Sequence, residues 1–400
     1  MTRQVQDAYI VAAVRTPVGK APRGMLRNVR PDDMLAHVLR GVLAQVPGLE
    51  ARDIADVIVG CAMPEAEQGM NVARIGVLLA GFPDSVPAMT VNRFCSSGVQ
   101  AVALAADRIR TGDDDVVVAA GTESMSMVPM MGNKIALNDA VFAHDEHVAI
   151  AYGMGITAEK VAQQWKVSRE DQDAFAVASH QKAAKAIASG AFRAEILPYE
   201  IASATPDLAR GTIAQGRRTV DTDEGPRPDS TVEALARLRT VFAARGSVTA
   251  GNSSQTSDGA AAVVLMSERA LKRYGVKPLA RFAGFAVAGV PPEIMGIGPI
   301  KAIPKVLEAT GVKREDLDWI ELNEAFAAQS LAVIRELGLD PAKVNPQGGA
   351  IALGHPLGAT GAVRTATLVH GMRRTGGKYG MVTMCIGTGM GAAGLFEALH

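Results

Sequence analysis

Residues 91–122 read VNRFCSSGVQAVALAADRIRTGDDDVVVAAGT, and this stretch determines the expected fold. A polar Gly/Ser segment follows Val91-Asn92, a helical pattern runs to Arg110, and a wholly apolar run occupies 116–120 before a Gly-Thr pair. Residues 344–388 repeat this order, from Val344-Asn345 through a Gly-rich segment, a helical pattern, an apolar run and a second Gly-Thr pair. The repetition predicts that the two halves of the chain are copies of one supersecondary unit.

Short apolar runs alternate with Ala-rich helical patterns along the whole chain. Continuous apolar runs are typical of strands that are buried on both faces of a parallel sheet. Their alternation with helices favours a layered α/β fold with a parallel-rich sheet. The expected strands are Ile10–Val14, Val57–Val59, Val116–Ala120, Ala262–Met266 and Met381–Met384, and the expected helices are Met34–Gln45, Val99–Arg110, Asp171–Ser189 and Ala362–Arg373.

The character of the sequence changes between residues 125 and 255. This part has Met-rich stretches, long helical patterns and a charged, Pro-containing segment, Arg217 to Ser230, that is expected to form a loop. A polar turn cluster over Gly251 to Gly259 then leads back to a buried strand. We therefore expect an N-terminal half at 1–124, completed by about 256–278, an inserted subdomain at 125–255, and a C-terminal half at 279–400.

The composition disfavours several classes of function. The 400 residues carry 41 basic and 41 acidic side chains, so no net field would attract nucleic acid or an anionic membrane. No run reaches the roughly 18 apolar residues of a membrane span, residues 1–9 contain no signal core, and residues 397–400 are not a peroxisomal targeting tail. The three cysteines have neither zinc nor disulfide spacing, which favours a reducing compartment and a cytoplasmic protein.

Cys95 is the first candidate for chemistry. It lies after an apolar run and just before a helical pattern, where the positive end of the helix dipole would lower the pKa of its thiol. Ser96 or Ser97 could cap that helix. A buried structural cysteine is the competing interpretation, although the flanking Arg93 and serines disfavour a dry pocket.

The other two cysteines differ in their settings. Cys385 ends the last apolar run, before glycines at 387, 389 and 391 that allow tight turns and whose N–H groups could bind an anion. A glycine-rich hairpin with an incidental cysteine is the alternative interpretation of that segment. Cys61 follows a strand pattern and precedes Pro64, and we expect it to be a packing residue.

A histidine and an asparagine are further candidates. His355 lies among glycines, and Pro356 fixes the next φ angle, so the imidazole would be held at a loop tip where a general base could act. A turn histidine bonded to the backbone would give the same pattern. Asn323-Glu324 follows an apolar run and opens an expected helix over Ala325–Arg335, so an N-cap is the alternative to a role in the site.

The sequence indicates neither a metal site nor a nucleotide-phosphate loop. His144 and His147, in the segment HDEH, have no further ligands nearby. Neither a P-loop pattern nor a GxGxxG motif after a strand is present. His37, His180 and His370 fall on helical patterns and are expected to be ordinary surface or packing residues.

Four segments together resemble the signatures of the thiolase family. They are NRFCSSG at 92–98, NEAFA at 323–327, GGAIALGHPLGATG at 348–361 and CIGTGMG at 385–391. They stand in the family's order and spacing, and family-like sequence extends from Ile10 to Phe396. The resemblance implies a duplicated, five-layered αβαβα core with a mixed five-stranded sheet in each half, and an inserted loop domain that grips coenzyme A. It also implies a homodimer or homotetramer.

The resemblance assigns a role to each motif residue. Cys95 would take the acyl group, His355 would activate its thiol, and Cys385 would be the second acid/base. A water held by Asn323 would form one oxyanion hole with His355, and the backbone N–H groups of Cys95 and Gly387 would form the other. No metal or cofactor is implied, because coenzyme A is a substrate. The residues implied in binding the substrate and coenzyme A are Ser254, Arg227, Met154 and Phe326, and Arg217-Arg218 would be either a further contact or a solvated pair.

The implied reaction is thiolytic cleavage of 3-ketoacyl-CoA by coenzyme A in fatty acid β-oxidation, or its reversal. Gly153 stands where acetoacetyl-specific relatives carry a histidine, which favours a broad chain-length range over an acetoacetyl-CoA-specific biosynthetic thiolase. Thr360 replaces a more usual serine. Cys385 disfavours a ketoacyl synthase, which would carry His or Asn there, and the intact motifs disfavour a silent CoA-binding or lipid-binding relative. The direction of the reaction and a hydratase/dehydrogenase partner stay open.

Overall fold

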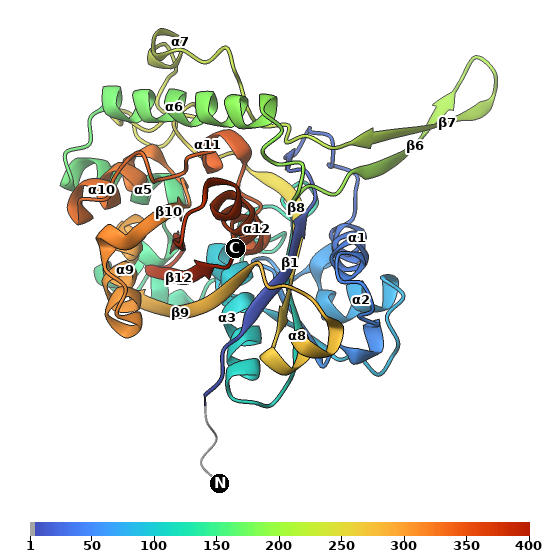
Figure 1. Ribbon diagram of the computed structural model, residues 1–400. Coiled ribbons are helices and arrows are strands. Elements are labelled where there is room, and N and C mark those ends of the chain that lie inside the picture. Colours follow the sequence, from blue (N-terminus) through green and yellow to red (C-terminus); the bar gives the residue numbers. More distant parts are fainter. Residues whose placement is uncertain (1–4) are drawn as a thin grey trace.

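The computed structural model describes residues 5–400, and its largest element is one long mixed sheet (Figure 1). The strand order across this sheet is β4–β3–β5–β8–β1–β9–β12–β11–β10, and the short β2 pairs with β8. Every strand expected from the apolar runs lies within one of these strands, so those predictions are confirmed. The bounds are β1 (Tyr9–Arg15), β2 (Gly19–Lys20), β3 (Asp56–Gly60), β4 (Ala88–Val91), β5 (Val116–Ser124), β8 (Ser257–Met266), β9 (Ala280–Gly289), β10 (Leu317–Leu322), β11 (Tyr379–Ile386) and β12 (Met390–Ala398).

The sheet consists of two copies of one pattern that meet in the middle. In the N-terminal copy, β3 is parallel to β4 and β5, while β8 runs antiparallel to β5 and β1. In the C-terminal copy, β11 is parallel to β10, and β12 runs antiparallel to β11 and β9. The copies join where Tyr9 and Ile10 of β1 pair with β9. The counterpart of β4 is reduced to a bridge between Val344 and Ile320, so the C-terminal copy departs from the expected five strands.

Helices separate and cover the two copies of the sheet. One core cluster joins α1 and α2 to the N-terminal strands, a second joins α3 and α12 to both sets of strands, and a third joins α9 and α10 to the C-terminal strands (Figure 1). This arrangement is the expected duplicated αβαβα core. These helices are α1 (Pro31–Ala44), α2 (Val72–Leu79), α3 (Ser97–Arg110), α9 (Gly298–Thr310), α10 (Ala327–Leu337) and α12 (Leu357–Thr375).

Strand β5 shows why the buried strands are continuously apolar. Val116 and Val118 pack in the cluster under α1, whereas Val117 and Ala119 pack in the central cluster with α3 and α12. Successive side chains of a strand point to opposite faces, so a strand between two helical layers needs an apolar residue at every position.

The segment between β5 and β8 lies outside this repeated pattern. Its longest helix, α6, begins where the Ser168 hydroxyl accepts the N–H of Asp171 at 3.1 Å. Its strands form a hairpin that projects from the body of the molecule (Figure 1). The loop expected from Arg217 onward is wrong in its first part, because residues 217–220 belong to that hairpin and Arg217 forms an exposed ion pair with Glu200. The elements of this segment are α4 (Asp145–Val148), α5 (Met154–Gln164), α6 (Arg169–Ala188), β6 (Tyr199–Asp207), β7 (Thr212–Val220) and α7 (Val232–Ala236), and the shorter helices elsewhere are α8 (Glu268–Tyr274) and α11 (Ala350–Leu353).

A buried ion cluster ties this segment to the core. Arg15 on β1 is 1% exposed, and its guanidinium contacts Glu195 at 2.6 Å and Asp223 at 2.7 Å. The Thr367 hydroxyl on α12 also donates to Glu195, at 2.8 Å.

Across residues 5–400, no helix is both long enough and apolar enough to cross a membrane.

Candidate active site

Cys95 and His355 are brought together by the crossing of α3 and α12. Cys95 lies in the turn Phe94–Ser96 directly before α3, and His355 lies just before α12. At the crossing, a Cβ atom on Gly98 would lie 2.5 Å from the Ala362 nitrogen, and one on Gly361 would lie 2.0 Å from the Val99 nitrogen. Because only glycine permits this approach, the N-termini of the two repeated helices meet, together with the residues that precede them.

Cys95 is half-buried, and its thiol is held in the protonated form. Burial raises the pKa of Cys95 to about 11, while the backbone N–H groups of Gly387 and of Cys95 itself lower it in part. The expectation that the helix N-terminus would depress this pKa is therefore wrong, because desolvation outweighs the donors. A base is needed to produce the thiolate.

The two serines after Cys95 do not cap α3 as expected. Ser96 occupies the N-cap position, but its hydroxyl donates to the Arg93 carbonyl at 3.1 Å. The Ser97 hydroxyl donates to the Phe94 carbonyl at 2.7 Å and accepts the Arg93 N–H at 2.8 Å. Both side chains therefore fix the tight turn around Cys95, in which Phe94 has a φ angle of 43°.

His355 is a buried, neutral base. Burial, with a smaller effect of the Arg364 charge, lowers the pKa of His355 to about 3. Its Nε2 lies 3.3 Å from the Asn323 amide nitrogen, and its Nδ1 lies 2.7 Å from the Thr360 hydroxyl. Since the amide nitrogen is a donor, Nε2 accepts and Nδ1 carries the hydrogen toward Thr360. Nε2 is therefore the ring atom that can take a proton.

Asn323 belongs to the site and does not cap a helix. The helix after it begins at Ala327 with Phe326 at its N-cap position, so the N-cap interpretation of Asn323-Glu324 is wrong. The Asn323 N–H donates to the Thr383 carbonyl on β11 at 2.9 Å. Its side-chain oxygen is buried and has no hydrogen-bond partner among residues 5–400, so its acceptor capacity is unused.

Cys385 is the penultimate residue of β11 and is 1% exposed. Burial raises the pKa of its thiol, and the neighbouring Cys95 raises it further. The hairpin expected around Cys385 is present, since β11 and β12 pair up to Ile386–Met390. Cys385 also packs in one apolar cluster with Phe326 and Met154, so the hairpin carries it into the same site.

The Gly387 turn faces the nucleophile. A Cβ atom on Gly387 would lie 3.7 Å from the Met154 sulfur and 3.8 Å from the Phe94 ring. The structure thus brings Cys95, Gly387 and Met154 together at the end of β11. Cys61 directly follows β3 and is fully buried, burial raises the pKa of its thiol, and it packs as the sequence suggests.

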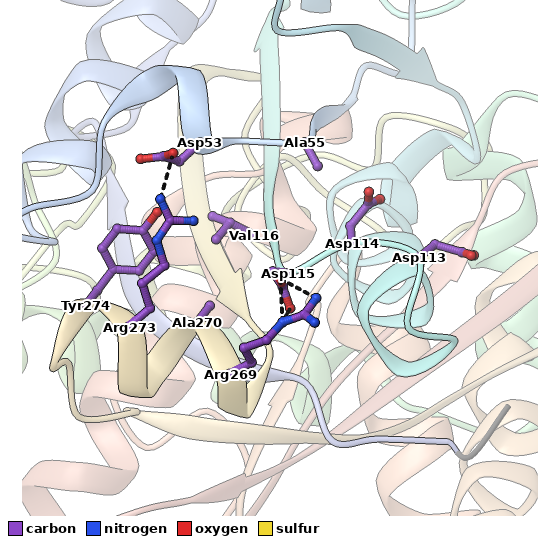
Figure 2. Close-up of a pocket in the computed structure, with 10 residues that line it drawn as sticks. All are labelled: Asp53, Ala55, Asp113, Asp114, Asp115, Val116, Arg269, Ala270, Arg273 and Tyr274. Carbon is purple, nitrogen blue, oxygen red and sulfur yellow. Dashed lines mark hydrogen bonds and ion pairs between the residues drawn. The ribbon is translucent and has the colours of Figure 1, made fainter.

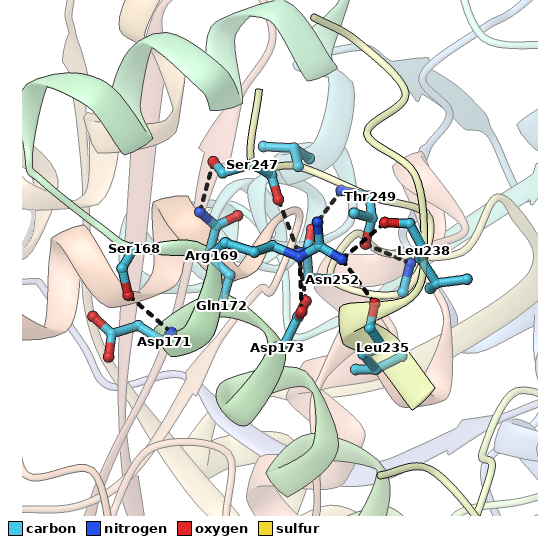
Figure 3. A network of polar contacts seen from close by, with 12 residues as sticks. Ser168, Arg169, Asp171, Gln172, Asp173, Leu235, Leu238, Ser247, Thr249 and Asn252 are labelled. Carbon is cyan, nitrogen blue, oxygen red and sulfur yellow. Dashed lines mark hydrogen bonds and ion pairs between the residues drawn. The ribbon is translucent and has the colours of Figure 1, made fainter. Parts of the chain in front are cut away.

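Ser254 lies in a segment that contacts both the loop after Asn323 and His355. Its N–H donates to the Ala325 carbonyl at 3.0 Å, and bridges join Ser253 to Phe326 and Thr256 to His355. Figure 3 shows how α6 supports the preceding turn: the Asn252 amide donates to Asp173 at 2.9 Å, and its oxygen accepts the Thr249 N–H at 2.8 Å.

Arg227 is exposed on a separate loop. Its N–H donates to Nδ1 of His180 at 3.1 Å. Burial lowers the pKa of His180 to about 4, so this ring stays neutral and keeps its acceptor nitrogen. His180 was expected to be an ordinary helical residue, yet it anchors the loop of the candidate coenzyme A contact.

The pocket in Figure 2 is unrelated to these residues. It has a volume of about 310 Å³ and is lined by acidic residues that include Asp53 and Asp115, with Arg269, Arg273 and Tyr274. Both arginines are already paired with these carboxylates. Within residues 5–400, no group of three or more His, Cys, Asp or Glu side chains could hold a metal ion.

Known families and structures match this chain over nearly its whole length. Models described as "Thiolase, N-terminal domain" and "Thiolase, C-terminal domain" match residues 8–269 and 276–398. The chain belongs to the thiolase family. It is 52% identical over 394 residues to a 3-ketoacyl-CoA thiolase of Bacillus subtilis, covering 98% of this chain and 100% of that protein.

Two solved structures show the same fold. The first is an acetyl-CoA acetyltransferase of Bacillus anthracis, with a TM-score of 0.89 and 42% identity over 100% of both chains. The second is the dimeric peroxisomal thiolase of Saccharomyces cerevisiae, with a TM-score of 0.87 and 43% identity over 98% of both chains. The thiolase family membership makes this protein an acyltransferase enzyme.

Sequence reasoning missed several residues that support the thiolase site. Ser257 accepts the His355 N–H at 3.0 Å, and the buried Glu123 contacts the segment that follows His355. Glu123 had one visible signal, because it is the only charged residue of a strand that begins with the apolar run 116–120. The sequence assigned no role of its own to Glu324 beyond a possible N-cap with Asn323, although its carboxylate is also buried.

Proposed function

We propose that this enzyme cleaves 3-ketoacyl-CoA with coenzyme A, giving acetyl-CoA and a shortened acyl-CoA. One observation carries the proposal: a neutral imidazole whose Nε2 can take a proton lies in the same site as two protonated thiols, the half-buried Cys95 and the buried Cys385. A thiol nucleophile, its base and a second proton carrier are what a reversible Claisen cleavage needs.

The first half of the reaction forms an acyl-cysteine. His355 takes the Cys95 proton, and the thiolate attacks the 3-keto carbon of the substrate. The Cα–Cβ bond then breaks, and the departing acetyl-CoA enolate takes a proton from Cys385. The N–H groups of Cys95 and Gly387, which face the Cys95 sulfur, support their proposed role as donors to one oxyanion.

The second half regenerates the free enzyme. The thiol of incoming coenzyme A gives its proton to the Cys385 thiolate and attacks the acyl-cysteine carbonyl. The tetrahedral intermediate collapses, and Cys95 leaves as a thiolate that recovers its proton from the imidazolium of His355. Asn323 lies 3.3 Å from His355 and supports a second oxyanion site there. No further cofactor enters this cycle.

We further propose a broad chain-length range in fatty acid β-oxidation, in a cytoplasmic homodimer or homotetramer. The similarity to the B. subtilis 3-ketoacyl-CoA thiolase supports the substrate class, and the yeast relative supports dimers. Gly153 supports broad specificity, since a Cβ there would meet nothing within 4 Å. Exposed Arg227 and the Ser254 segment are the proposed contacts for coenzyme A, and Met154 and Phe326 for the acyl-pantetheine region.

The test is a thiolysis assay across substrates from acetoacetyl-CoA to 3-ketododecanoyl-CoA. Loss of the 3-ketoacyl-CoA absorbance after addition of coenzyme A reports kcat/KM for each chain length. We expect activity throughout the series, with longer substrates favoured over acetoacetyl-CoA. Activity that peaks at acetoacetyl-CoA and falls steeply would instead identify an acetoacetyl-CoA-specific thiolase, and no thiolysis at all would refute the reaction.

A further inference from the structure

Two buried carboxylates, Glu123 and Glu324, lie on either side of His355 and have no role in the chemistry above. Their exposed fractions are 0% and 1%. We propose that they are positioning residues that hold the two ends of the His355 turn, so that Nε2 is presented to Cys95. This inference rests on the proposed function, in which His355 is the base.

Glu123, at the end of β5, holds the segment after His355. One carboxylate oxygen accepts the Gly358 N–H and the Ala62 N–H, both at 2.8 Å. The other accepts the Gln68 amide at 2.6 Å and the Met63 N–H at 3.3 Å. Gly358 lies in the first turn of α12, where backbone N–H groups have no partner within the helix. The carboxylate therefore fixes where α12 begins, directly after His355-Pro356.

The same carboxylate also reaches the nucleophile's side of the site. Ala62, whose N–H it accepts, receives the Asn92 amide on its carbonyl at 3.1 Å, and the Asn92 oxygen accepts the Phe94 N–H at 2.8 Å. Phe94 precedes Cys95. Glu123 thus connects the turn of the base to the turn of the nucleophile through hydrogen bonds.

Glu324 holds the segment before His355. Its carboxylate accepts the Ile351 N–H at 3.2 Å, the Ser179 hydroxyl at 2.7 Å and the Asn345 amide at 2.8 Å. Asn345 also bonds both backbone groups of Leu322, at 2.9 and 2.8 Å. Because Leu322 directly precedes Asn323, this network positions Asn323 as well as the segment before His355.

The charge of each carboxylate matters to this role. The hydrogen bonds that the two side chains make to the turn and its neighbours are all accepted from N–H, O–H or S–H donors, as an ionised carboxylate requires. Burial opposes ionisation and raises the pKa of both groups, and the donors lower it. Buried ionic groups often stabilise a fold no more than apolar residues of similar volume would. Two of them at the ends of one turn therefore favour a role in geometry.

The variants that test this inference are Glu123→Gln and Glu324→Gln. Each substitution keeps the side-chain shape. One carboxylate oxygen, however, becomes an NH2 group that faces the N–H and O–H donors already present. We expect kcat for thiolysis to fall about 10- to 100-fold, the effect of displacing a catalytic group by about 1 Å. KM for both substrates should stay within about threefold, because neither carboxylate contacts bound substrate. Glu195→Gln is the matched control: this carboxylate is equally buried but bonds Arg15 and Thr367, so kcat should be unchanged.

A double-mutant cycle with His355→Ala separates positioning from a general structural effect. If the carboxylates act mainly through the imidazole, each substitution should lower the residual activity of His355→Ala by clearly less than it lowers wild-type kcat. Equal losses in both backgrounds, or wild-type kcat in both single variants, would overturn the inference. If the Gln variants do not fold, Ser179→Ala removes one donor to Glu324 and should lower kcat in the wild-type background only. A wild-type enzyme without thiolysis would instead refute the proposed function.

Discussion

The hydrogen bond between His355 and Thr360 offers the sharpest test of the proposed mechanism. Nδ1 and the Thr360 hydroxyl are 2.7 Å apart, and both side chains are buried, at 5% and 1% exposure. Thr360→Val replaces this hydroxyl with a methyl group of similar size. The Nδ1 hydrogen then has no acceptor, and the ring is free to rotate or to change tautomer.

The expected loss follows from that unsatisfied donor. Leaving a buried polar group without its partner costs about 1–3 kcal/mol. If this cost falls on the transition state, kcat decreases about 5- to 150-fold, because each 1.36 kcal/mol is a factor of ten. KM should change little, since Thr360 is covered by protein. Thr360→Ser keeps the hydroxyl and should stay within about threefold of wild type.

The assay is steady-state thiolysis of a 3-ketoacyl-CoA by coenzyme A, with kcat and KM measured separately for wild type, Thr360→Val and Thr360→Ser. Thermal unfolding of each variant checks that the fold is retained. The reasoning fails if Thr360→Val keeps wild-type kcat, or if Thr360→Ser is as slow as Thr360→Val. Either result would mean that this hydroxyl does not orient the base.

Three further outcomes test the other assignments. Incubation with acetyl-CoA, an acid quench and peptide mass spectrometry should locate the acetyl group on Cys95; acetylation of Cys385 alone would reverse the two roles. Cys385→Ser should still accept an acyl group on Cys95 but lose about 10²–10⁴-fold in turnover, since proton transfer is lost; near-normal turnover would remove Cys385 from the mechanism. Gly153→His should shift kcat/KM toward acetoacetyl-CoA, because the position has room for a side chain; an unchanged chain-length profile would show that Gly153 is not the determinant.

Much of the core could be predicted because its residues alternate between two buried faces. Apolar runs such as Val116–Ala120 can satisfy that environment only as interior strands, and the repeated order of motifs required a repeated topology. The hairpin β6–β7 could not be predicted in this way. Its residues are mostly exposed, so no burial pattern marks them, and the expected loop from Arg217 was partly wrong.

The sequence by itself determined the duplicated α/β core, the family and the candidate residues Cys95, Asn323, His355 and Cys385. These follow from short-range patterns and motif spacing, which the linear chain contains in full. Only the tertiary structure decided the state of each group. The thiol pKa of Cys95 moved opposite to the helix-dipole expectation, because the extent of burial depends on what packs around the helix N-terminus.

The partners of His355 were likewise beyond the sequence. Asn323, which follows β10, contacts the imidazole, and Ser257 on β8 accepts the backbone N–H of His355. Glu123 on β5 accepts an N–H from the turn that follows His355. These contacts exist because α3 and α12 cross at glycines and bring segments together that are far apart in the chain. Charge state, tautomer and hydrogen-bond geometry depend on such three-dimensional neighbours, and residue order does not specify them.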